Sequence, residues 1–282
     1  MKIKFIVLQL LLCTALMAQE NQEAPQYGWQ REMTGGVNLT QTSFDNWAQG
    51  GENQMAWQLN LVFRFVNDQE KNNWANSGKF SFGSTKSGDD EIKKSIDEIK
   101  LESVYTHKLH VYINPYIAGT AETQFAPGYA YADEGKTQIS GFMDPGYFRE
   151  SMGVGFSKSE VVKTRLGAAL KQTITSDYPA PYADDPETLD KIEKTKNEIG
   201  AESVTDVNWK VTETSLFTSK LELFTNMKEF DEIDVNWDNV FTTKISKYFN
   251  VNFNLKLFYD KDISAKRQLK QAIALGLTYT FL

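Results

Sequence analysis

The amino-acid sequence predicts an all-β fold, a transmembrane antiparallel up-and-down β-barrel of about twelve strands. Three observations lead to this prediction. Apolar and polar residues alternate repeatedly from Gln54 onward, the alternating segments are about ten residues long, and short turns alternate with longer loops. A period of two places successive side chains on opposite faces of a strand, and about ten residues let a tilted strand cross a membrane.

The alternation is cleanest near the C-terminal end. One apolar face there consists of Phe249, Val251, Phe253, Leu255, Leu257 and Tyr259, opposite Asn250, Asn252, Asn254 and Lys256. The same criterion predicts strands near 35–43, 53–66, 74–84, 97–106, 111–124, 147–157, 161–173, 199–210, 214–226, 233–245, 248–260 and 268–281. Segment 111–124 has the weakest pattern, because Pro115 removes a ladder donor.

The connections predict an orientation. Short turns are expected near 67–68, 107–108, 158–159, 211–212 and 246–247, and longer loops near 44–52, 85–96, 125–146, 174–198, 227–232 and 261–267. Outer-membrane barrels have short periplasmic turns and longer external loops, and an even strand number puts both termini in the periplasm. Residues 185–198 predict a short helix within one loop, with Asp185 as its cap and Pro186 in its first turn.

The N-terminus predicts a signal peptide. Lys2 and Lys4 precede an apolar run at 5–12, and small residues follow at 15–18. We expect cleavage near Ala18 or Gln19, so that 1–18 is the signal peptide, 19–34 a periplasmic N-terminal segment and 35–282 the outer-membrane β-barrel. Cys13 is the only cysteine. Without it, the mature chain has neither a disulfide framework nor a thiol nucleophile.

Composition excludes several classes of protein. Beyond the N-terminus no stretch approaches the ~20 apolar residues of a membrane-spanning helix, and a formal net charge of −7 argues against nucleic acid as a partner. A secreted β-sandwich would also alternate, but aromatic residues gather near both ends of the expected strands, as at two lipid-water interfaces. They are Trp57, Phe148, Trp237 and Tyr259 on the loop side, and Trp74, Tyr105, Phe156, Trp209, Tyr279 and Phe281 on the turn side.

Three irregular segments carry a family resemblance. They are Phe44-Asp45-Asn46-Trp47-Ala48-Gln49-Gly50-Gly51-Glu52-Asn53, Thr123-Gln124-Phe125-Ala126-Pro127-Gly128-Tyr129 and Ile139-Ser140-Gly141-Phe142-Met143-Asp144-Pro145. The chain thereby resembles the Bacteroidota outer-membrane barrels assigned to a domain of unknown function, which implies a location and a fold but no activity. In the family-motif loop, formed by Asn46, Trp47, Gly50 and Gly51, we expect the glycines to allow a tight turn with positive φ and Trp47 to cap the rim.

The candidate site is a set of charged residues on the lumen face. Cations predominate on the earlier strands and acids on the later ones, with Glu102 among the cations and Lys210, Lys220 and Lys244 among the acids. The predicted lumen charges are Arg64, Lys79, Lys100, Arg149, Lys163, Arg165, Lys171, Glu202, Asp206, Glu222, Asp234 and Asp238. One basic and one acidic wall would orient polar solutes in an open pore, whereas in a closed barrel they would form a salt-bridged plug, which the predicted size favours.

Catalytic chemistry finds little support in the sequence. The two histidines, His107 and His110, fall at an expected turn, far from the outer-leaflet wall where a lipid hydrolase would need one. The acidic pairs of the loops, such as Asp184-Asp185, lack calcium-loop spacing. We therefore expect no catalytic residues, no metal site and no cofactors.

The functional prediction is correspondingly broad. We expect a narrow or plugged pore for small polar solutes or a structural subunit of an envelope complex, with a lipid-modifying enzyme as the alternative. The expected location is the outer membrane of a Gram-negative bacterium. Expected partners are its lipid and lipopolysaccharide, the barrel-assembly machinery, which would bind the aromatic C-terminal strand, and possible further envelope proteins.

Overall fold

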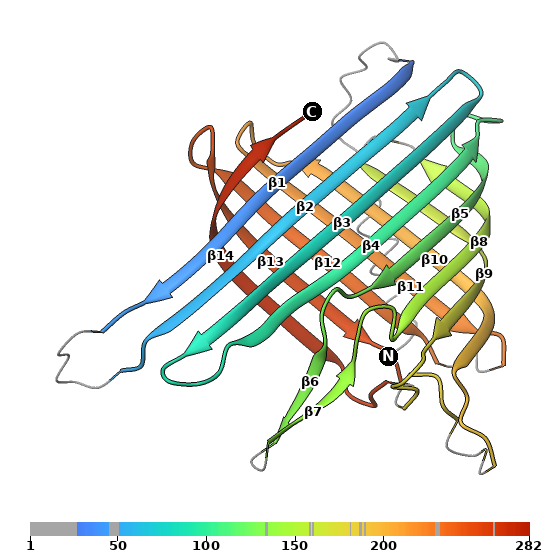
Figure 1. Cartoon of the computed structure of the whole chain (residues 1–282). Coiled ribbons are helices and arrows are strands. Elements are labelled where there is room, and N and C mark those ends of the chain that lie inside the picture. The colour runs from blue at the N-terminus through green and yellow to red at the C-terminus, as the bar shows by residue number, and fades with distance from the viewer. Residues whose placement is uncertain are drawn as a thin grey trace.

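The computed structural model describes residues 27–44, 51–132, 135–157, 159, 161–180, 182–185, 188, 190–228, 232–261 and 263–282. Twelve of the strands in these residues close into an antiparallel barrel (Figure 1). The expected signal peptide and its cleavage site lie outside the described residues. No helix in the described ranges is long and apolar enough to cross a membrane.

The barrel strands follow the chain around the ring, except where β8 pairs with β5. Their bounds are β1 (Gly28–Thr42), β2 (Gln54–Asp68), β3 (Asn72–Ser87), β4 (Lys93–His107), β5 (Ile113–Thr123), β8 (Gly146–Ser157), β9 (Val162–Ile174), β10 (Thr195–Lys210), β11 (Ser215–Asn226), β12 (Asp234–Lys244), β13 (Phe249–Tyr259) and β14 (Gln268–Thr280). The remaining strands, β6 (Gly128–Ala132) and β7 (Gly135–Ser140), form a separate hairpin between β5 and β8.

The predicted all-β barrel of twelve antiparallel strands is confirmed, and every predicted strand overlaps one of the barrel. Short turns and the C-terminus lie at one end, while the longer loops and the β6–β7 hairpin lie at the other (Figure 1). β5 accommodates Pro115, which lies opposite Val154 of β8. An isolated proline therefore does not interrupt this strand.

Two local predictions were wrong. The first strand begins at Gly28 instead of 35, because Gly28 to Thr34 pair with β2 in continuous register; polar residues on both faces hide this part of the strand from a hydropathy pattern. The short helix predicted at 185–198 is also absent among the described residues of that segment. Thr195 already lies opposite Ile174, so strand pairing outweighs the capping signals in the sequence.

The outer surface of the barrel is mostly apolar. Ile117, Leu166 and Ile273 point outward from β5, β9 and β14 and are 57%, 58% and 69% exposed. Aromatic residues mark the turn side, where the Trp29 and Trp74 rings lie 6.1 Å apart and the Tyr279 and Phe281 rings 5.0 Å apart. Such a band is costly in water and favourable in lipid, and a closed ladder satisfies the backbone there.

Candidate functional site

Charged side chains from opposite walls meet in the middle of the lumen. Lys79 of β3 lies 2.8 Å from Glu98 and 3.2 Å from Asp238 of β12. Lys100 of β4 lies 2.7 Å from Glu222 of β11. These strands lie on opposite sides of the ring, so the ion pairs cross the barrel interior.

A second cluster centres on two buried glutamates. Glu102 of β4 accepts hydrogen bonds from Arg165 of β9 and, at 2.5 Å, from Lys220 of β11. Glu202 of β10 is only 2% exposed and accepts hydrogen bonds from Ser151 at 2.6 Å and from Tyr116 at 3.2 Å. Because each carboxylate has several donors, the cluster compensates the cost of burying its charges.

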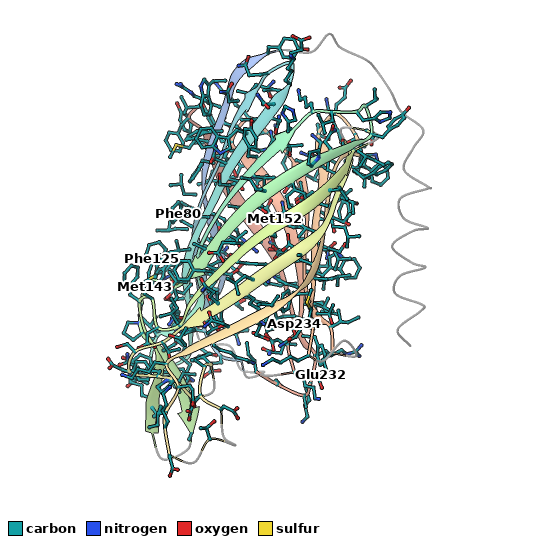
Figure 2. All side chains as sticks on the ribbon, turned by 90° about the vertical axis from the view of Figure 1, so that its right-hand side faces the viewer. Phe80, Phe125, Met143, Met152, Glu232 and Asp234 are labelled. Atoms are coloured by element: carbon teal, nitrogen blue, oxygen red, sulfur yellow. The ribbon has the colours of Figure 1, made fainter. Side chains whose placement is uncertain are left out.

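The third cluster lies toward the loops and surrounds one lysine with three acids. The ammonium group of Lys171 is 2.7 Å from Asp234, 3.0 Å from Asp260 and 3.4 Å from Glu198. Asp234 projects from the barrel wall at the loop end in Figure 2. Lys171 therefore joins β9 to β10, to β12 and to the loop that follows β13.

The predicted lumen charges mostly meet one another. Ten of them take part in ion pairs within 4 Å: Lys79, Lys100, Arg149, Arg165, Lys171, Glu202, Asp206, Glu222, Asp234 and Asp238. Lys163 lies in register with Asp206, and Arg64 with Glu32 on the turn side. The two walls are nevertheless mixed in sign, since Glu98 and Glu102 arise from the same side as Lys79, and Lys220 from the side of the acids.

Sequence reasoning missed four acids of these ion pairs: Glu98, Glu198, Asp260 and Glu122, the last of which lies 3.6 Å from Lys100. Glu98 and Glu122 have the same strand parity as neighbouring lumen residues, which was the available signal. Glu198 lay in the segment predicted as a helix. Asp260 is the last residue of the predicted strand 248–260, where Phe258 has already interrupted the polar face, and it lies just beyond the end of β13.

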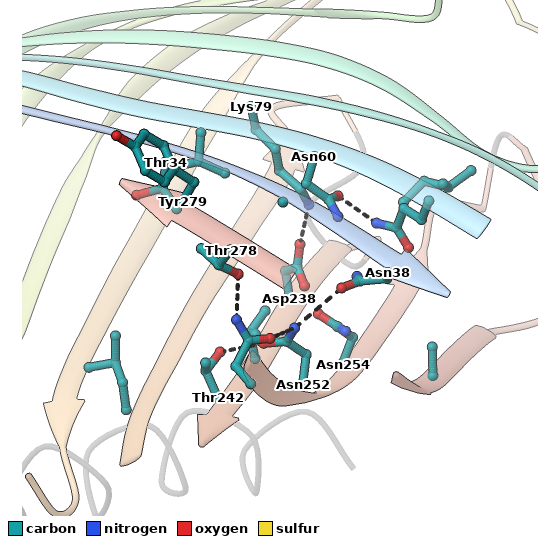
Figure 3. Close-up of a pocket in the computed structure, with 18 of the residues that line it drawn as sticks. Thr34, Asn38, Asn60, Lys79, Asp238, Thr242, Asn252, Asn254, Thr278 and Tyr279 are labelled. Carbon is teal, nitrogen blue, oxygen red and sulfur yellow. Dashed lines mark hydrogen bonds and ion pairs between the residues drawn. The ribbon is translucent and has the colours of Figure 1, made fainter. Parts of the chain in front are cut away.

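A polar cavity of about 890 Å³ occupies the other side of the lumen, next to β1, β2, β13 and β14 (Figure 3). Its lining includes Ser246, Tyr248 and Thr280 at the turn end. Toward the loops it passes the ion pairs of Glu98 and includes Ser95, Asp97 and Lys270. Amides and hydroxyls form a large part of its wall, among them Thr34, Asn38, Gln58, Asn60, Thr242, Asn250, Asn252, Asn254 and Thr278.

The amides of this wall form a connected network. Asn252 donates to Asn250 at 2.7 Å and to Asn38 at 3.5 Å, and it accepts from Thr242 at 2.9 Å. The network closes over Gly276, where an added Cβ would lie 2.5 Å from the Asn250 Oδ1 and 2.6 Å from the Asn38 Oδ1. The predicted alternation identified the asparagine face of β13 but not this convergence with β1.

Hydrogen bonds to two carboxylates hold loop segments at the loop end of the barrel. We call residues 124–145, which follow β5, the cap. The Asp97 carboxylate accepts hydrogen bonds from the backbone N–H groups of Phe125 and Ala126 at 2.7 and 2.9 Å and lies 2.8 Å from the Lys94 ammonium group. Asp144 similarly accepts from the backbone N–H groups of Ser176 and Asp177. Phe80, Phe125 and Met143 follow one another along one outer side of the barrel (Figure 2).

The family-motif loop is described only at its ends. Gly51 has a φ of +149°, as expected for a glycine of this loop, and an added Cβ would lie 2.7 Å from the Phe44 ring. The Phe44 N–H donates to the Asn53 side chain at 2.6 Å, which ties the two ends together. Asn46, Trp47 and Gly50 lie outside the described residues.

The two histidines make local contacts at the turn side. His107 Nδ1 lies 2.7 Å from Asn72 Oδ1, and His110 Nδ1 accepts a hydrogen bond from the Tyr112 N–H at 3.3 Å. In the part of the chain that the structure describes, no group of three or more His, Cys, Asp or Glu side chains is arranged to hold a metal ion.

A closed antiparallel barrel with an apolar outside and a polar inside defines a transmembrane β-barrel of the outer-membrane type. Residues 39–129 match the family model described as Protein of unknown function (DUF3078). This match supports the family resemblance found in the sequence, and it includes the first two of the three segments. No curated protein matches the sequence.

The chain is similar to several solved structures at low sequence identity. The translocator domain of the autotransporter NalP from Neisseria meningitidis is 10% identical with a TM-score of 0.43, covering 98% of this chain and 95% of that one. An outer-membrane channel from Pseudomonas putida F1 is 12% identical with a TM-score of 0.40, covering 93% and 98%. The NanC porin is 8% identical with a TM-score of 0.40, covering 89% and 100%.

Proposed function

We propose that this protein is a plugged barrel of the Gram-negative outer membrane that takes small polar solutes into its lumen without conducting them continuously. The short turns and both termini face the periplasm, and the loops face the exterior. Its surroundings are outer-membrane lipid and lipopolysaccharide, and β14 is the segment that the barrel-assembly machinery recognises during insertion.

One observation carries the proposal, namely that ion pairs cross the lumen while a cavity remains next to β1, β2, β13 and β14. Lys79–Asp238 and Lys100–Glu222 join opposite walls at mid-height. A twelve-stranded barrel is intermediate between the filled eight-stranded and the open sixteen-stranded barrels, so side chains of this length can fill part of it. The lining of the remaining cavity extends to Ser246, Tyr248 and Thr280 at the turn end, so we infer that solutes enter it from the periplasm.

Single-channel recording in planar bilayers tests the proposal. The folded wild-type protein should give no conductance steps, whereas the double variant Lys100→Ser, Glu222→Ser should give discrete steps because it removes a central cross-lumen pair. The control double variant, Lys93→Ser with Asp90→Ser, removes an exposed ion pair at the loop end and should give no conductance steps. Regular steps from the wild-type protein would contradict the plug. Heat-modifiable gel mobility verifies that every variant is folded.

A further inference from the structure

The barrel closes through an unusually short contact between its first and last strands. β1 and β14 share six residue pairs, from Thr34 opposite Thr280 to Leu39 opposite Leu275, whereas β1 and β2 share fifteen. Toward the loops, β1 leaves β14 (Figure 1). We call this contact the seam.

Above the seam, one side of β14 has no strand beside it among the described residues. Residues 268–274 pair with β13 but have no register partner on β1, and we call them the open edge. Residues 268–273 are exposed whether they face inward or outward. A closed barrel normally satisfies the backbone N–H and C=O groups on both sides of each strand.

The outer face of the open edge is apolar, like the outer wall beside it. Ile273 and Leu269 point outward from it and are 69% and 61% exposed. Ile273 is flanked on β13 by Phe253, which lies opposite Phe241 of β12, so an apolar row continues from the edge along the outer wall. Unpaired backbone groups do not face hydrocarbon without another source of hydrogen bonds.

The polar cavity reaches the same edge from the inside. Lys270 and Ala272 of the open edge line the cavity, together with Asn38 of β1 and Asn254 of β13. The seam is therefore where an amide-lined cavity adjoins the lipid-facing surface. A ligand at this place meets polar groups on one side and hydrocarbon on the other.

Among the described residues at this end of the cavity, Lys270 is the lining lysine with no acid within 4 Å, whereas the lining acids Asp97 and Glu122 are paired with Lys94 and Lys100. Lys79, Lys256 and Lys270 face Glu98 and Asp238; Lys79 contacts both acids, and Lys256 lies 3.5 Å from Glu98. Lys270 donates to the backbone oxygen of Ser95 at 2.7 Å, and it lies directly opposite Lys256 on the neighbouring strand. Adjacent like charges are unfavourable, and one anionic group would relieve them.

We propose that the seam is a lateral portal that holds an anionic lipid, with its head group in the amide-lined cavity near Lys270 and its acyl chains passing the open edge into the bilayer. The head group and its ester linkages supply hydrogen-bond partners for the backbone of residues 268–274. This inference rests on the proposed membrane location and names the ligand of the proposed cavity. It does not depend on whether the central ion pairs block conduction.

Photocrosslinking tests the portal on the full-length protein. A benzophenone amino acid replaces Ala272 at the open edge or, as the control, Ala118, which faces the lumen from β5 away from the seam. The protein is reconstituted in vesicles of phosphatidylcholine and phosphatidylglycerol and irradiated. We expect lipid adducts at position 272, several-fold more than at position 118, with phosphatidylglycerol enriched over its share of the vesicle.

The lysine variants test the head-group site. Lys270→Gln should abolish the enrichment of phosphatidylglycerol, Lys270→Arg should retain it, and Lys210→Gln, which changes a lysine outside the cavity, should leave it unchanged. Irradiation in native outer membranes then separates a glycerophospholipid from lipid A by the mass of the adduct. Equal adduct yields at the two positions, or a protein adduct at position 272, would overturn the portal. The conductance recordings address the plug separately.

Discussion

The ammonium group of Lys100 on β4 lies 2.7 Å from the Glu222 carboxylate on β11, and this contact spans the barrel lumen. Asn236 donates a second hydrogen bond to Glu222 at 2.7 Å. The Glu222 side chain is 6% exposed and that of Lys100 is 17% exposed. A carboxylate buried to this extent depends on its partners to stay charged.

Lys100→Gln should therefore destabilise the barrel strongly, because it leaves the buried Glu222 charge uncompensated. The expected loss is about 3–5 kcal/mol in the free energy of unfolding. The double variant Lys100→Met, Glu222→Leu removes both charges and should be less destabilised than the single variant. Urea unfolding in detergent micelles measures both, and a single variant as stable as the wild type would show that the pair is not buried.

The sequence predicts the strands far better than it predicts these partners. Each spanning strand carries its own alternation, so the face containing Phe253 and Leu255 can be recognised without knowledge of any neighbour. The partner of Lys79 is Asp238, 159 residues away, and the shear and closure of the whole barrel bring them together. The alternation indicates that both side chains face inward, but it does not give their relative positions along the barrel axis.

The contacts of the cap and of the seam could not be predicted from the sequence, for related reasons. Asp97 binds backbone N–H groups of Phe125 and Ala126, and such partners leave no charge pattern in the sequence. The seam depends on where β1 stops pairing with β14, which is a property of the sheet as a whole. The helix predicted near Asp185 shows the converse error, since local capping signals were present but pairing with β9 prevailed.

Asp97 should control the order of the cap without controlling the barrel. Asp97→Asn keeps the shape of the side chain but removes its charge and one acceptor site, weakening the bonds to Phe125, Ala126 and Lys94. We expect a local loss of ~1–3 kcal/mol. Hydrogen exchange should accelerate at 124–145 while the barrel strands stay protected.

Asp90→Asn is the matched control for this prediction. Its side chain is 57% exposed and pairs with Lys93 at the surface, and the Lys93 ammonium group lowers the pKa of Asp90 through this hydrogen bond. Surface pairs contribute little to stability. Exchange in the cap should remain at the wild-type rate, and an equal effect of both variants would argue against a specific role of Asp97.

Close strand packing near Tyr116 should make Gly153 intolerant of a side chain. A Cβ at Gly153 would clash with the Leu166 carbonyl oxygen and lie 2.5 Å from the Gly167 Cα. Gly153→Ala should cost about 1–3 kcal/mol, because the backbone of β9 would have to shift. Gly119→Ala, where nothing lies within 4 Å of the added Cβ, should leave stability nearly unchanged. Thermal unfolding followed by gel mobility compares the two, and equal midpoints would contradict the predicted packing.

The last prediction distinguishes an outer wall that is covered by lipid from one that is exposed to water. Ile117 of β5 is 57% exposed on the outer wall, and Leu109, in the turn before β5, is 69% exposed. If lipid covers Ile117, an arginine there must bring its charge into hydrocarbon, at a cost of about 2–4 kcal/mol near the bilayer centre.

Ile117→Arg should accordingly reduce the folded fraction in lipid vesicles, whereas Leu109→Arg should fold as well as the wild type because its turn lies in water. Refolding from urea into vesicles, followed by heat-modifiable gel mobility, measures both variants under the same conditions. Since Ile117 is the less exposed of the two, exposure alone cannot produce the expected order. Equal folding of the two variants would mean that the wall around Ile117 faces water, and it would remove the basis for placing this barrel in a membrane.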